Sequence, residues 1–192
     1  NDAGKVYING KDIDIHLSEV KSMVGYVPEY IDFDQDLSIY DNLLVYGALF
    51  GLTDKEVKTH VVKFSDIFSF RDKLLLYPHD LSTGVLRSLQ LVRAMLHNPE
   101  ILILDEPTLG MDLQNKLKFW DVIQTLCSEK TVLFTTQDLY EPERYADRIS
   151  ILHHGNIMMD GSLDRLIGAT NKLLKFQINF VNNAPDQILD KI

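Results

Sequence analysis

The hydrophobic pattern along the chain predicts short strands separated by helical segments. Ile101 to Leu104 is an unbroken run of branched apolar residues, which predicts a strand covered on both faces, as in a parallel sheet flanked by helices. Val24 to Val27, which is stopped by Pro28, and Thr131 to Thr135 predict two further short strands. Strands that alternate with helices indicate an α/β fold.

Helix-start signals lie between the first two of these strands. Each is a hydroxyl side chain followed three residues later by an acid, a pairing that satisfies free backbone N–H groups at a helix start. The pairs are Ser38 with Asp41 and Thr53 with Glu56. Residues from about 31 to 79 are therefore predicted to form a mainly helical insert. Helical periodicity returns from Leu86 to Leu96, and Asn98-Pro99 ends it.

The two ends of the chain carry hairpin and strand signals. Val6 to Asn9 predicts a strand, and Asn9-Gly10 is a strong hairpin-turn pair. Residues 146 to 161 predict a second hairpin with its turn near Gly155-Asn156, followed by a short helix from Ser162. Apolar and polar residues alternate from Leu174 to Phe180, which predicts a half-buried strand at the start of a further β region.

Composition excludes some classes of protein. The chain has 192 residues, which suits one domain with a small subdomain, and its net charge of -9 gives no support for nucleic-acid binding. Cys127 is the one cysteine, so no internal disulfide can form, which fits a reducing compartment. The longest apolar stretch, Leu43 to Leu52, is far shorter than the ~20 residues that cross a bilayer. We expect a soluble chain whose membrane role would require a partner.

Two adjacent acids, Asp105 and Glu106, follow the strand at Ile101. Acids are common where strands end near water, so the position alone is a modest signal. Ligands of open α/β folds bind at the carboxyl edge of the sheet, however. There one carboxylate can hold Mg²⁺ and the next can polarise a water molecule. The pair therefore predicts phosphate chemistry if neighbouring motifs agree.

Five motifs between about Gly4 and Leu166 resemble those of ATP-binding cassette (ABC) ATPases and occur in the family's order. In chain order they are "VGYVPEY" for the Q-loop, with Glu29 at the glutamine position; Leu81-Ser82-Thr83-Gly84-Val85 for the LSGGQ signature; Ile101 to Asp105 for Walker B, with Glu106 after it and Leu109 to Asp112 for the D-loop; "VLFTTQD" for the switch, with Gln137 at the histidine position; and "ADRISILHHGNIMMDGS" for the closing hairpin.

The resemblance implies an α/β fold, namely a P-loop NTPase core with a parallel sheet plus a helical subdomain, truncated at its N-terminus. Residues 1–30 and 86–167 would form the RecA-like core, and residues 31–85 the helical subdomain that carries the signature. Residues 168–192 would begin a C-terminal accessory β region.

The resemblance also assigns roles and cofactors, which are ATP and Mg²⁺. Asp105 would be the magnesium ligand, Glu106 the general base that orients the attacking water, and Gln137 the residue at the γ-phosphate. Glu29 would sense nucleotide and could also ligate magnesium. The remaining nucleotide-binding residues would act on the ATP of an opposite subunit, through the helix start and the D-loop. They are Ser82, Thr83, Gly84 and Asp112.

Three features depart from the family pattern: a missing motif and two substituted positions. No G-x-x-x-x-G-K-[ST] phosphate loop occurs in the printed sequence, so we expect a truncated chain that binds ATP poorly alone, with a true partial subunit as the alternative. Glu29 adds a negative charge where glutamine is usual. Gln137 can hydrogen-bond but cannot carry a proton charge as histidine can. Both substitutions favour slow hydrolysis or one degenerate site in an asymmetric pair.

The resemblance is greatest to nucleotide-binding subunits of bacterial and archaeal exporters for drugs, sodium or polysaccharides. Such a subunit would bind a membrane permease and a second ABC subunit, identical or different, at the cytoplasmic face of the membrane, with no nucleic-acid partner. The first alternative is a catalytically weak regulatory partner with little turnover. The second is a soluble ABC ATPase without a permease.

Several side chains also have simpler explanations. Ser82 could be an ordinary helix N-cap, and Asp112 could equally cap a helix that runs to about Cys127. Remaining expectations concern residues without a chemical role. Arg87 and Arg93 are expected as surface charges, His153 and His154 as solvated, Cys127 as a small hydrophobe and Trp120 as a core residue.

Overall fold

The computed structural model describes residues 4–170, with side chains through Gly168. These residues divide into two compact units at the junction between Glu141 and Pro142. Each unit is described by itself. The strand predicted for Leu174 to Phe180 lies outside the described residues. No helix among residues 4–170 has the length and apolar character needed to cross a bilayer.

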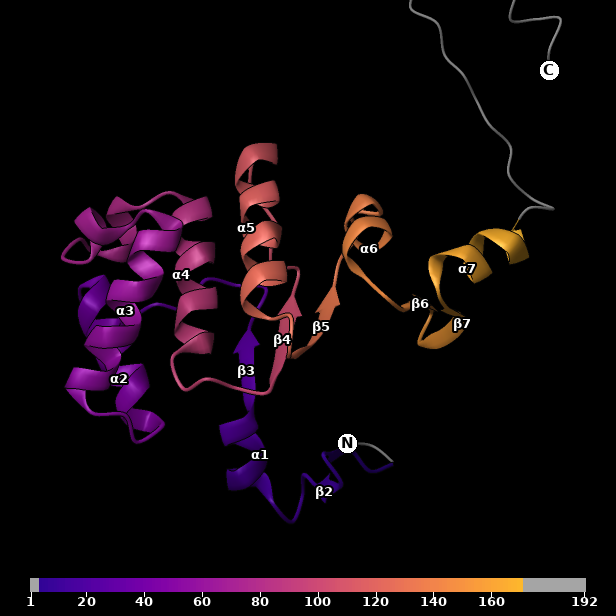
Figure 1. Cartoon of the computed structure of the whole chain (residues 1–192), viewed down its shortest axis with the longest axis horizontal. Helices are drawn as coiled ribbons and strands as arrows, with labels where there is room; N and C mark the ends of the chain where they lie inside the picture. The colour runs from indigo at the N-terminus through magenta and orange to yellow at the C-terminus, as the bar shows by residue number, and fades with distance from the viewer. Residues whose placement is uncertain (1–3, 171–192) are drawn as a thin grey trace, which may run out of the picture. The chain divides into compact units, whose positions relative to one another are not determined.

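A parallel sheet organises the first unit, as the sequence predicts. It consists of β3 (Val24–Val27), β4 (Ile101–Asp105) and β5 (Thr131–Thr135) in the order β3-β4-β5. Both pairings are parallel, with Val24 opposite Ile101 and Ile101 opposite Thr131. The three strands therefore point the same way, and their carboxyl ends share one edge (Figure 1).

The two faces of this sheet are not equally covered, contrary to the expectation for β4. Leu102 and Leu104 are fully buried, whereas the residues that alternate with them, Ile101, Ile103 and Asp105, are only half-buried. On the second face, Tyr26 and Leu133 flank Ile103 in register and are 46% and 60% exposed. The packed helices lie against the Leu102–Leu104 face, which explains the difference in burial.

Helices form between β3 and β4, where the sequence predicts a mainly helical segment. It contains α2 (Ile39–Leu49), α3 (Asp54–Phe68) and two short 3₁₀ helices, Arg71–Lys73 and Pro78–Asp80, before α4 (Thr83–Met95). These helices lie together on one side of the sheet (Figure 1).

The two predicted helix starts differ in detail. The capping box of Thr53 and Glu56 forms in full, since each side chain accepts a hydrogen bond from the other residue's backbone N–H. At α2 only half of the box forms. Ser38 Oγ accepts from the backbone N–H of Asp41, but the Asp41 carboxylate accepts from the Ser38 hydroxyl at 2.6 Å instead of from the backbone.

The remaining elements of the first unit are short, apart from α5 (Leu113–Leu126). The predicted hairpin at Asn9-Gly10 joins β1 (Tyr7–Ile8) to β2 (Lys11–Asp12). Two helices have no counterpart in the sequence patterns. They are α1 (Leu17–Met23), with seven residues, and α6 (Tyr140–Tyr145), with six, which crosses the junction between the two units. His16, at the start of α1, makes no side-chain cap, so the usual start signal is missing there.

The second unit contains the predicted closing hairpin and last helix. The elements are β6 (Ile149–His153), β7 (Asn156–Gly161) and α7 (Leu163–Thr170). His154 and Gly155 make the turn with positive φ angles of 47° and 76°. Arg148, which donates to Asp160 across the two strands, holds the pKa of that carboxyl at about 2. His153 and His154 are exposed, as expected.

The core of the first unit contains two expected residues and two unexpected ones. Trp120 is 2% exposed and packs on Phe134, and Cys127 is buried, which raises the pKa of its thiol. The expectation that Arg87 and Arg93 are surface charges is wrong, because they are only 4% and 8% exposed. Their side chains instead hydrogen-bond to the chain that follows β3.

Gly25 sets the distance between α4 and the sheet. A Cβ at this position in β3 would lie 2.4 Å from the backbone oxygen of Ala94 in α4, and 2.7 and 2.9 Å from Leu102 and Pro99 atoms. Such contacts are closer than non-bonded atoms can approach, and backbone cannot rotate away as a side chain can. The glycine therefore allows the helix to pack directly on the strand.

Gly25→Ala should lower the free energy of unfolding by about 1–3 kcal/mol, the usual cost of overpacking a well-packed core. Chemical denaturation measures it. Gly168→Ala in α7 is the matched control, because nothing lies within 4 Å of a Cβ there and alanine favours a helix. Equal effects of the two substitutions would contradict the close approach at Gly25.

His97 joins the helical insert to the start of β3. Its ring stacks on Phe50 of the segment after α2 at 3.9 Å between centroids, and Nε2 donates to the carbonyl oxygen of Val24 at 3.1 Å. Among the described residues, the buried Nδ1 has no hydrogen-bond partner. Burial lowers the pKa of His97, against the opposing effect of the Val24 carbonyl, and the charge of Lys130 lowers it further.

This burial should make stability depend on pH. The unfolded imidazole binds a proton near its ordinary pKa of about 6.5, while the folded one resists it. The stabilisation is therefore complete above pH about 6.5 and is lost as the pH falls toward the lower folded pKa. We expect the melting temperature to fall less between pH 7.5 and 5.5 in His97→Gln than in the wild type. An identical fall in both proteins would rule out this role.

Candidate functional site

The carboxyl edge of the sheet collects the predicted catalytic positions. Asp105 is the last residue of β4 and Glu106 follows it, while Glu29 and Gln137 lie two residues beyond the ends of β3 and β5. Because the three strands are parallel neighbours, these residues leave the sheet at the same edge (Figure 1). Glu29 and Gln137 are exposed, and the two acids after β4 are half-buried.

Thr135 braces both acids. It is opposite Asp105 in the register of β4 and β5, and its hydroxyl donates to Asp105 Oδ1 at 2.5 Å. The Thr135 hydroxyl oxygen in turn accepts from the backbone N–H of Glu106 at 3.1 Å, and the Thr135 carbonyl oxygen lies 3.2 Å from that nitrogen. One residue of β5 therefore fixes the side chain of Asp105 and the backbone of Glu106.

Glu106 has an unusual backbone conformation. Its φ angle is +45°, in the left-handed region that side chains other than glycine rarely occupy. Such a conformation costs on the order of 1–3 kcal/mol and is found mainly where the surrounding structure imposes it, often at active sites. The extended backbone of β4 ends at this residue. The Glu106 side chain therefore need not continue the alternation of side chains between the two faces of the sheet.

A buried carboxylate lies behind this edge. Glu141 is 4% exposed and accepts hydrogen bonds from the hydroxyls of Thr108 and Thr136, the latter at 2.6 Å. Thr108 belongs to the loop after Glu106, and Thr136 directly precedes Gln137. Glu141 therefore ties the loop after β4 to the loop after β5.

Lys116 supplies the positive charge next to this carboxylate. Its Nζ lies 2.8 Å from Asp138 Oδ2 and 3.9 Å from Glu141 Oε1. The hydrogen bond to Asp138, together with the charges of Asp138, Glu141 and Glu106, raises the pKa of Lys116. Sequence reasoning missed Thr135, Glu141 and Lys116. The available signal was a pair of threonines directly before Gln137 and an acid one helical turn after it.

The signature residues lie at the start of α4, beside a different loop. Ser82 occupies the N-cap position, but its side chain makes no capping hydrogen bond and is exposed. The Ser82 hydroxyl therefore does not act as an ordinary helix N-cap, which was the simpler explanation for this residue. A Cβ on Gly84 would lie 3.5 Å from Asn115 Nδ2, and one on Gly110 would lie 3.4 Å from Thr83 Cγ2. Ser82 to Gly84 is thus placed against the loop and first turn of α5.

Asp112 caps α5, as the simpler explanation states. Its Oδ1 accepts from the backbone N–H of Asn115 at 2.9 Å and its Oδ2 from the Asn115 side chain at 2.6 Å. These hydrogen bonds lower the pKa of Asp112. A D-loop role would have to use an acid that is already engaged within its own helix.

A metal ion would need ligands beyond the side chains of this edge. Among residues 4–170, no group of three or more His, Cys, Asp or Glu could hold one. Asp105 and Glu29 nevertheless leave neighbouring strands at the same edge of the sheet, and burial, followed by the negative charge of Asp105, raises the pKa of Tyr26 in β3. Mg²⁺ commonly binds through one or two carboxylates with water and phosphate oxygens. Asp105 and Glu29 fit that pattern.

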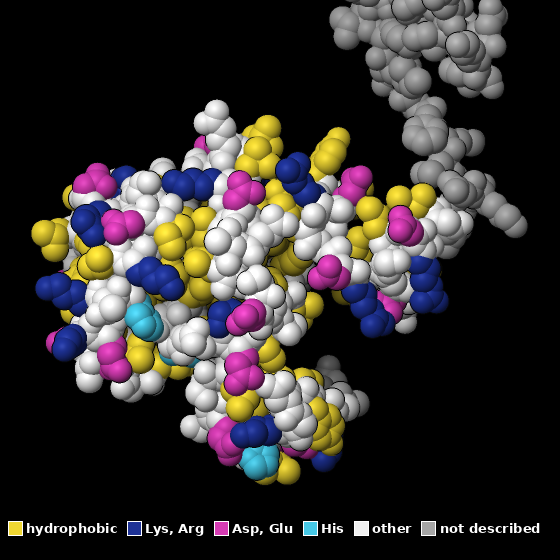
Figure 2. Space-filling view, viewed as in Figure 1, with side chains coloured by type: hydrophobic (Ala, Val, Ile, Leu, Met, Phe, Trp, Pro, Cys, Tyr) yellow, Lys and Arg dark blue, Asp and Glu magenta, His cyan; other side chains and the backbone are white. Residues whose placement is uncertain are grey.

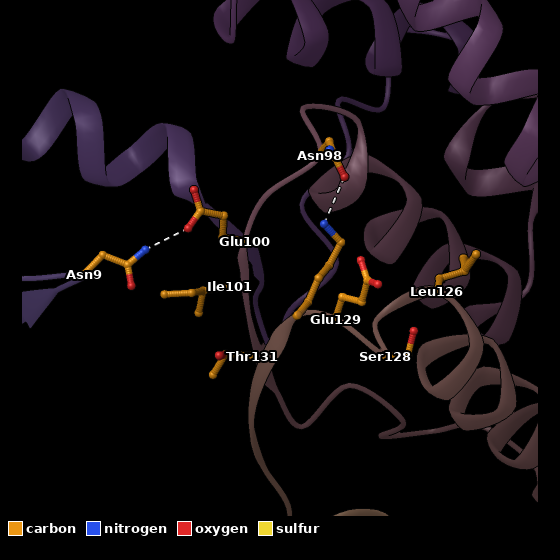
Figure 3. Close-up of a pocket in the computed structure, with 9 residues that line it drawn as sticks. Asn9, Asn98, Glu100, Ile101, Leu126, Ser128, Glu129 and Thr131 are labelled. Atoms are coloured by element: carbon orange, nitrogen blue, oxygen red, sulfur yellow. Dashed lines mark hydrogen bonds between the residues drawn. The ribbon is translucent and has the colours of Figure 1, made fainter.

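One pocket of the first unit lies away from the edge that carries Asp105 and Glu106. Its volume is about 490 Å³, and it lies at the opposite ends of the strands, where Ile101 and Thr131 begin β4 and β5 (Figure 3). Its polar atoms pair with one another: Lys130 Nζ donates to Asn98 Oδ1 at 2.9 Å, and the Asn9 amide donates to Glu100 at 2.7 Å. Figure 2 shows charges of both signs interspersed on the face in view, without a basic stripe.

Comparisons with known proteins agree with these motifs. The family model described as "ABC transporter" matches residues 1–109. The "Nod factor export ATP-binding protein I" of Rhizobium sp. (strain N33) is 32% identical over 167 residues, which cover 86% of this chain and 55% of that protein. The protein of the same name from Paraburkholderia xenovorans (strain LB400) is 31% identical over 169 residues, 88% of this chain and 56% of that protein. The chain thus spans about half the length of these relatives.

Solved structures show the same fold. One described as the ATP-binding subunit of an ABC transporter superposes with a TM-score of 0.78 at 25% identity, covering 88% of this chain and 71% of that chain. A dimeric ATP-binding cassette in a post-hydrolysis state, bound to ADP and phosphate, has a TM-score of 0.75 at 21% identity, with coverage of 84% and 74%. The predicted family and fold class are confirmed: the chain belongs to the ABC transporter family and has the α/β P-loop NTPase fold of its ATP-binding subunits.

Proposed function

We propose that this chain is part of the ATP-hydrolysing subunit of an ABC exporter. The observation that carries the proposal is the pair Asp105 and Glu106, braced by Thr135 at the carboxyl edge of a parallel sheet. Such an edge is where α/β folds bind ligands, and two carboxylates there suit phosphoryl transfer to water. The word "export" in the names of the relatives supports the direction of transport.

In this proposal each residue has a distinct task. Asp105, together with Glu29 at the same edge of the sheet, would hold Mg²⁺, which would supply positive charge to neutralise the phosphates. Glu106 accepts a proton from the attacking water and orients it. Gln137 hydrogen-bonds to the terminal phosphate. Thr135, Glu141 and Lys116 touch no substrate and keep the two loops in place.

The signature residues serve a second copy or a related subunit. Ser82 has a free hydroxyl at the exposed N-terminus of α4, where backbone N–H groups and the helix dipole favour a phosphate. Thr83 and Gly84 complete that surface, and Asp112 lies in the loop beside it. A membrane permease would be the other partner, which places the complex at the cytoplasmic face. Copurification of the full-length protein with a membrane protein tests this, and its absence would favour a soluble ATPase.

Glu106→Gln in the full-length protein should lower kcat for ATP hydrolysis by about 10²–10⁴-fold, since an amide cannot act as a general base. ATP affinity should change little. Phosphate release and equilibrium nucleotide binding measure the two effects. Glu143→Gln, at an exposed position of α6, is the matched control and should retain full turnover. Unchanged turnover in Glu106→Gln would contradict the assigned base.

A regulatory subunit with little turnover is the second candidate function. The exposed Gln137 after β5 favours it, because glutamine cannot carry the positive charge of a protonated histidine beside a phosphate. Glu29 adds a negative charge at the same edge.

Gln137→His should raise kcat several-fold if the glutamine is what slows hydrolysis, and steady-state phosphate release measures it. Gln137→Ala controls for loss of the hydrogen bond and should be slower than wild type. If the wild type already turns over rapidly and histidine brings no gain, the regulatory candidate is wrong. If neither the wild type nor Gln137→His hydrolyses ATP, the enzyme proposal fails instead.

A further inference from the structure

Three buried polar side chains of α4 hold alternate carbonyl groups of the segment that carries Glu29. This segment, Pro28–Asp32, directly follows β3. Arg87 Nη1 donates to Pro28 O at 3.0 Å, Gln90 Nε2 to Tyr30 O at 2.7 Å, and Arg93 Nη1 to Asp32 O at 3.2 Å. Arg87, Gln90 and Arg93 are called the α4 ladder below.

The spacing of the α4 ladder matches the two backbones that it joins. Residues three apart lie on one face of a helix, whereas every second carbonyl of a non-helical segment can face the same way. The helix rises about 9 Å over six residues, and four residues of chain can span up to roughly 13 Å. The three carbonyl groups can thus be spread over a longer distance than the three helix positions. The two outer side chains must reach outward to meet their carbonyl groups and need to be longer than the middle one. Arginines occupy the outer positions and glutamine the middle.

The members of the ladder also support one another. Gln90, which is fully buried, accepts from Arg87 Nη1 at 3.3 Å and donates to Asp32 Oδ1 at 3.2 Å. Arg93 pairs with the same carboxylate at 2.5 Å, and its guanidinium stacks on Phe33 and Tyr46 at 5.0 and 5.1 Å. Each contact fixes a donor that holds the segment.

Stability alone is a poor reason for this arrangement. Burying a guanidinium carries a large desolvation cost, and apolar residues of similar size often stabilise a core as well or better. Among the described residues, Arg87 bears this cost without forming an ion pair, and its buried Nε has no hydrogen-bond partner. Burial lowers the pKa of Arg87, while the charge of nearby Glu29 opposes that shift. The guanidinium thus lies within electrostatic range of Glu29.

We propose that the α4 ladder fastens the Pro28–Asp32 segment to α4, so that Glu29 and the signature residues Ser82 to Gly84 move as one body. The functional part of this inference rests on the proposed function of Glu29 and of the signature. Arg87, Gln90 and Arg93 are then positioning residues. When α4 shifts toward or away from a nucleotide, the ladder carries Glu29 with it. Magnesium binding at one site is thereby coupled to engagement of the signature at another.

Hydrogen exchange of the full-length protein without nucleotide tests the mechanical part. Gln90→Met removes both the amide donor and the acceptor at similar size. We expect several-fold faster exchange in the peptide covering residues 29–32, with β5 unchanged. Ser88→Ala is the matched control, because it deletes a hydroxyl bond to Gly84 O within the same helix and touches no part of the segment. Unchanged exchange at residues 29–32 in Gln90→Met would overturn the proposal.

The functional part is tested by titrating Mg²⁺ in the ATPase assay. A loosened Glu29 should raise the apparent KM for Mg²⁺ several-fold in Gln90→Met and in Arg87→Met, whereas partial unfolding would lower kcat and leave that KM unchanged. Arg87→Lys retains a donor for Pro28 O and should restore the wild-type KM. Faster exchange with an unchanged magnesium KM would overturn the coupling. If the wild type hydrolyses no ATP, the proposed function fails, and the exchange experiment still decides whether the ladder fastens the segment.

Discussion

The register of the three parallel strands is the constraint on which the site depends. Asp105 faces Thr135 across β4 and β5, and this pairing lets one hydroxyl bond to the Asp105 carboxylate and to the Glu106 backbone. A slip of one residue would turn every side chain of a strand to the other face of the sheet. Leu102 and Leu104 would then leave the buried face, so the same burial that stabilises the sheet also keeps the two acids in place.

Buried polar groups extend this order from the strands to the loops. Glu141 connects the loops after β4 and β5, and the α4 ladder connects α4 to the segment after β3. Hydrophobic packing is non-directional and cannot specify the position of a loop atom, whereas a buried hydrogen bond can. Leaving such a group unpaired is expensive, so each connection holds in only one arrangement. The sheet is fixed by apolar burial, and the loops around its edge are fixed by these polar contacts.

Local patterns were enough to predict the elements that have local causes. The run at Ile101, the Thr53–Glu56 box and the Asn9-Gly10 turn each contain their own physical reason, and the predicted strand, capping box and hairpin all form, although the strand is well covered on one face only. The short helices α1 and α6 have no comparable start signal.

Burial of the two α4 arginines could not be predicted from local patterns, because its cause lies elsewhere in the chain. A charged residue in an amphipathic helix is normally solvated, and what buries Arg87 and Arg93 is a distant segment whose carbonyl groups need donors. The unequal cover of the two sheet faces has the same origin, because burial of Ile103 depends on what packs there and not on its own hydrophobicity. The position of the two acids at the sheet edge was predictable, because the order of the motifs identified the strand that they follow, while their catalytic roles stay predictions. Its braces, Thr135 and Glu141, were not, since they depend on contacts across the fold.

Charge balance links these observations to the proposed chemistry. Asp105, Glu106 and Glu29 follow neighbouring strand ends, and Lys116 is the cation whose pKa responds to Glu106. That lysine already pairs with Asp138 and stands close to Glu141, so little of its charge is left for the edge. Like charges at one edge disfavour one another unless a cation intervenes. In the proposed function a divalent metal would relieve this repulsion, and the position of Glu29, held through the α4 ladder, would decide how strongly the metal binds.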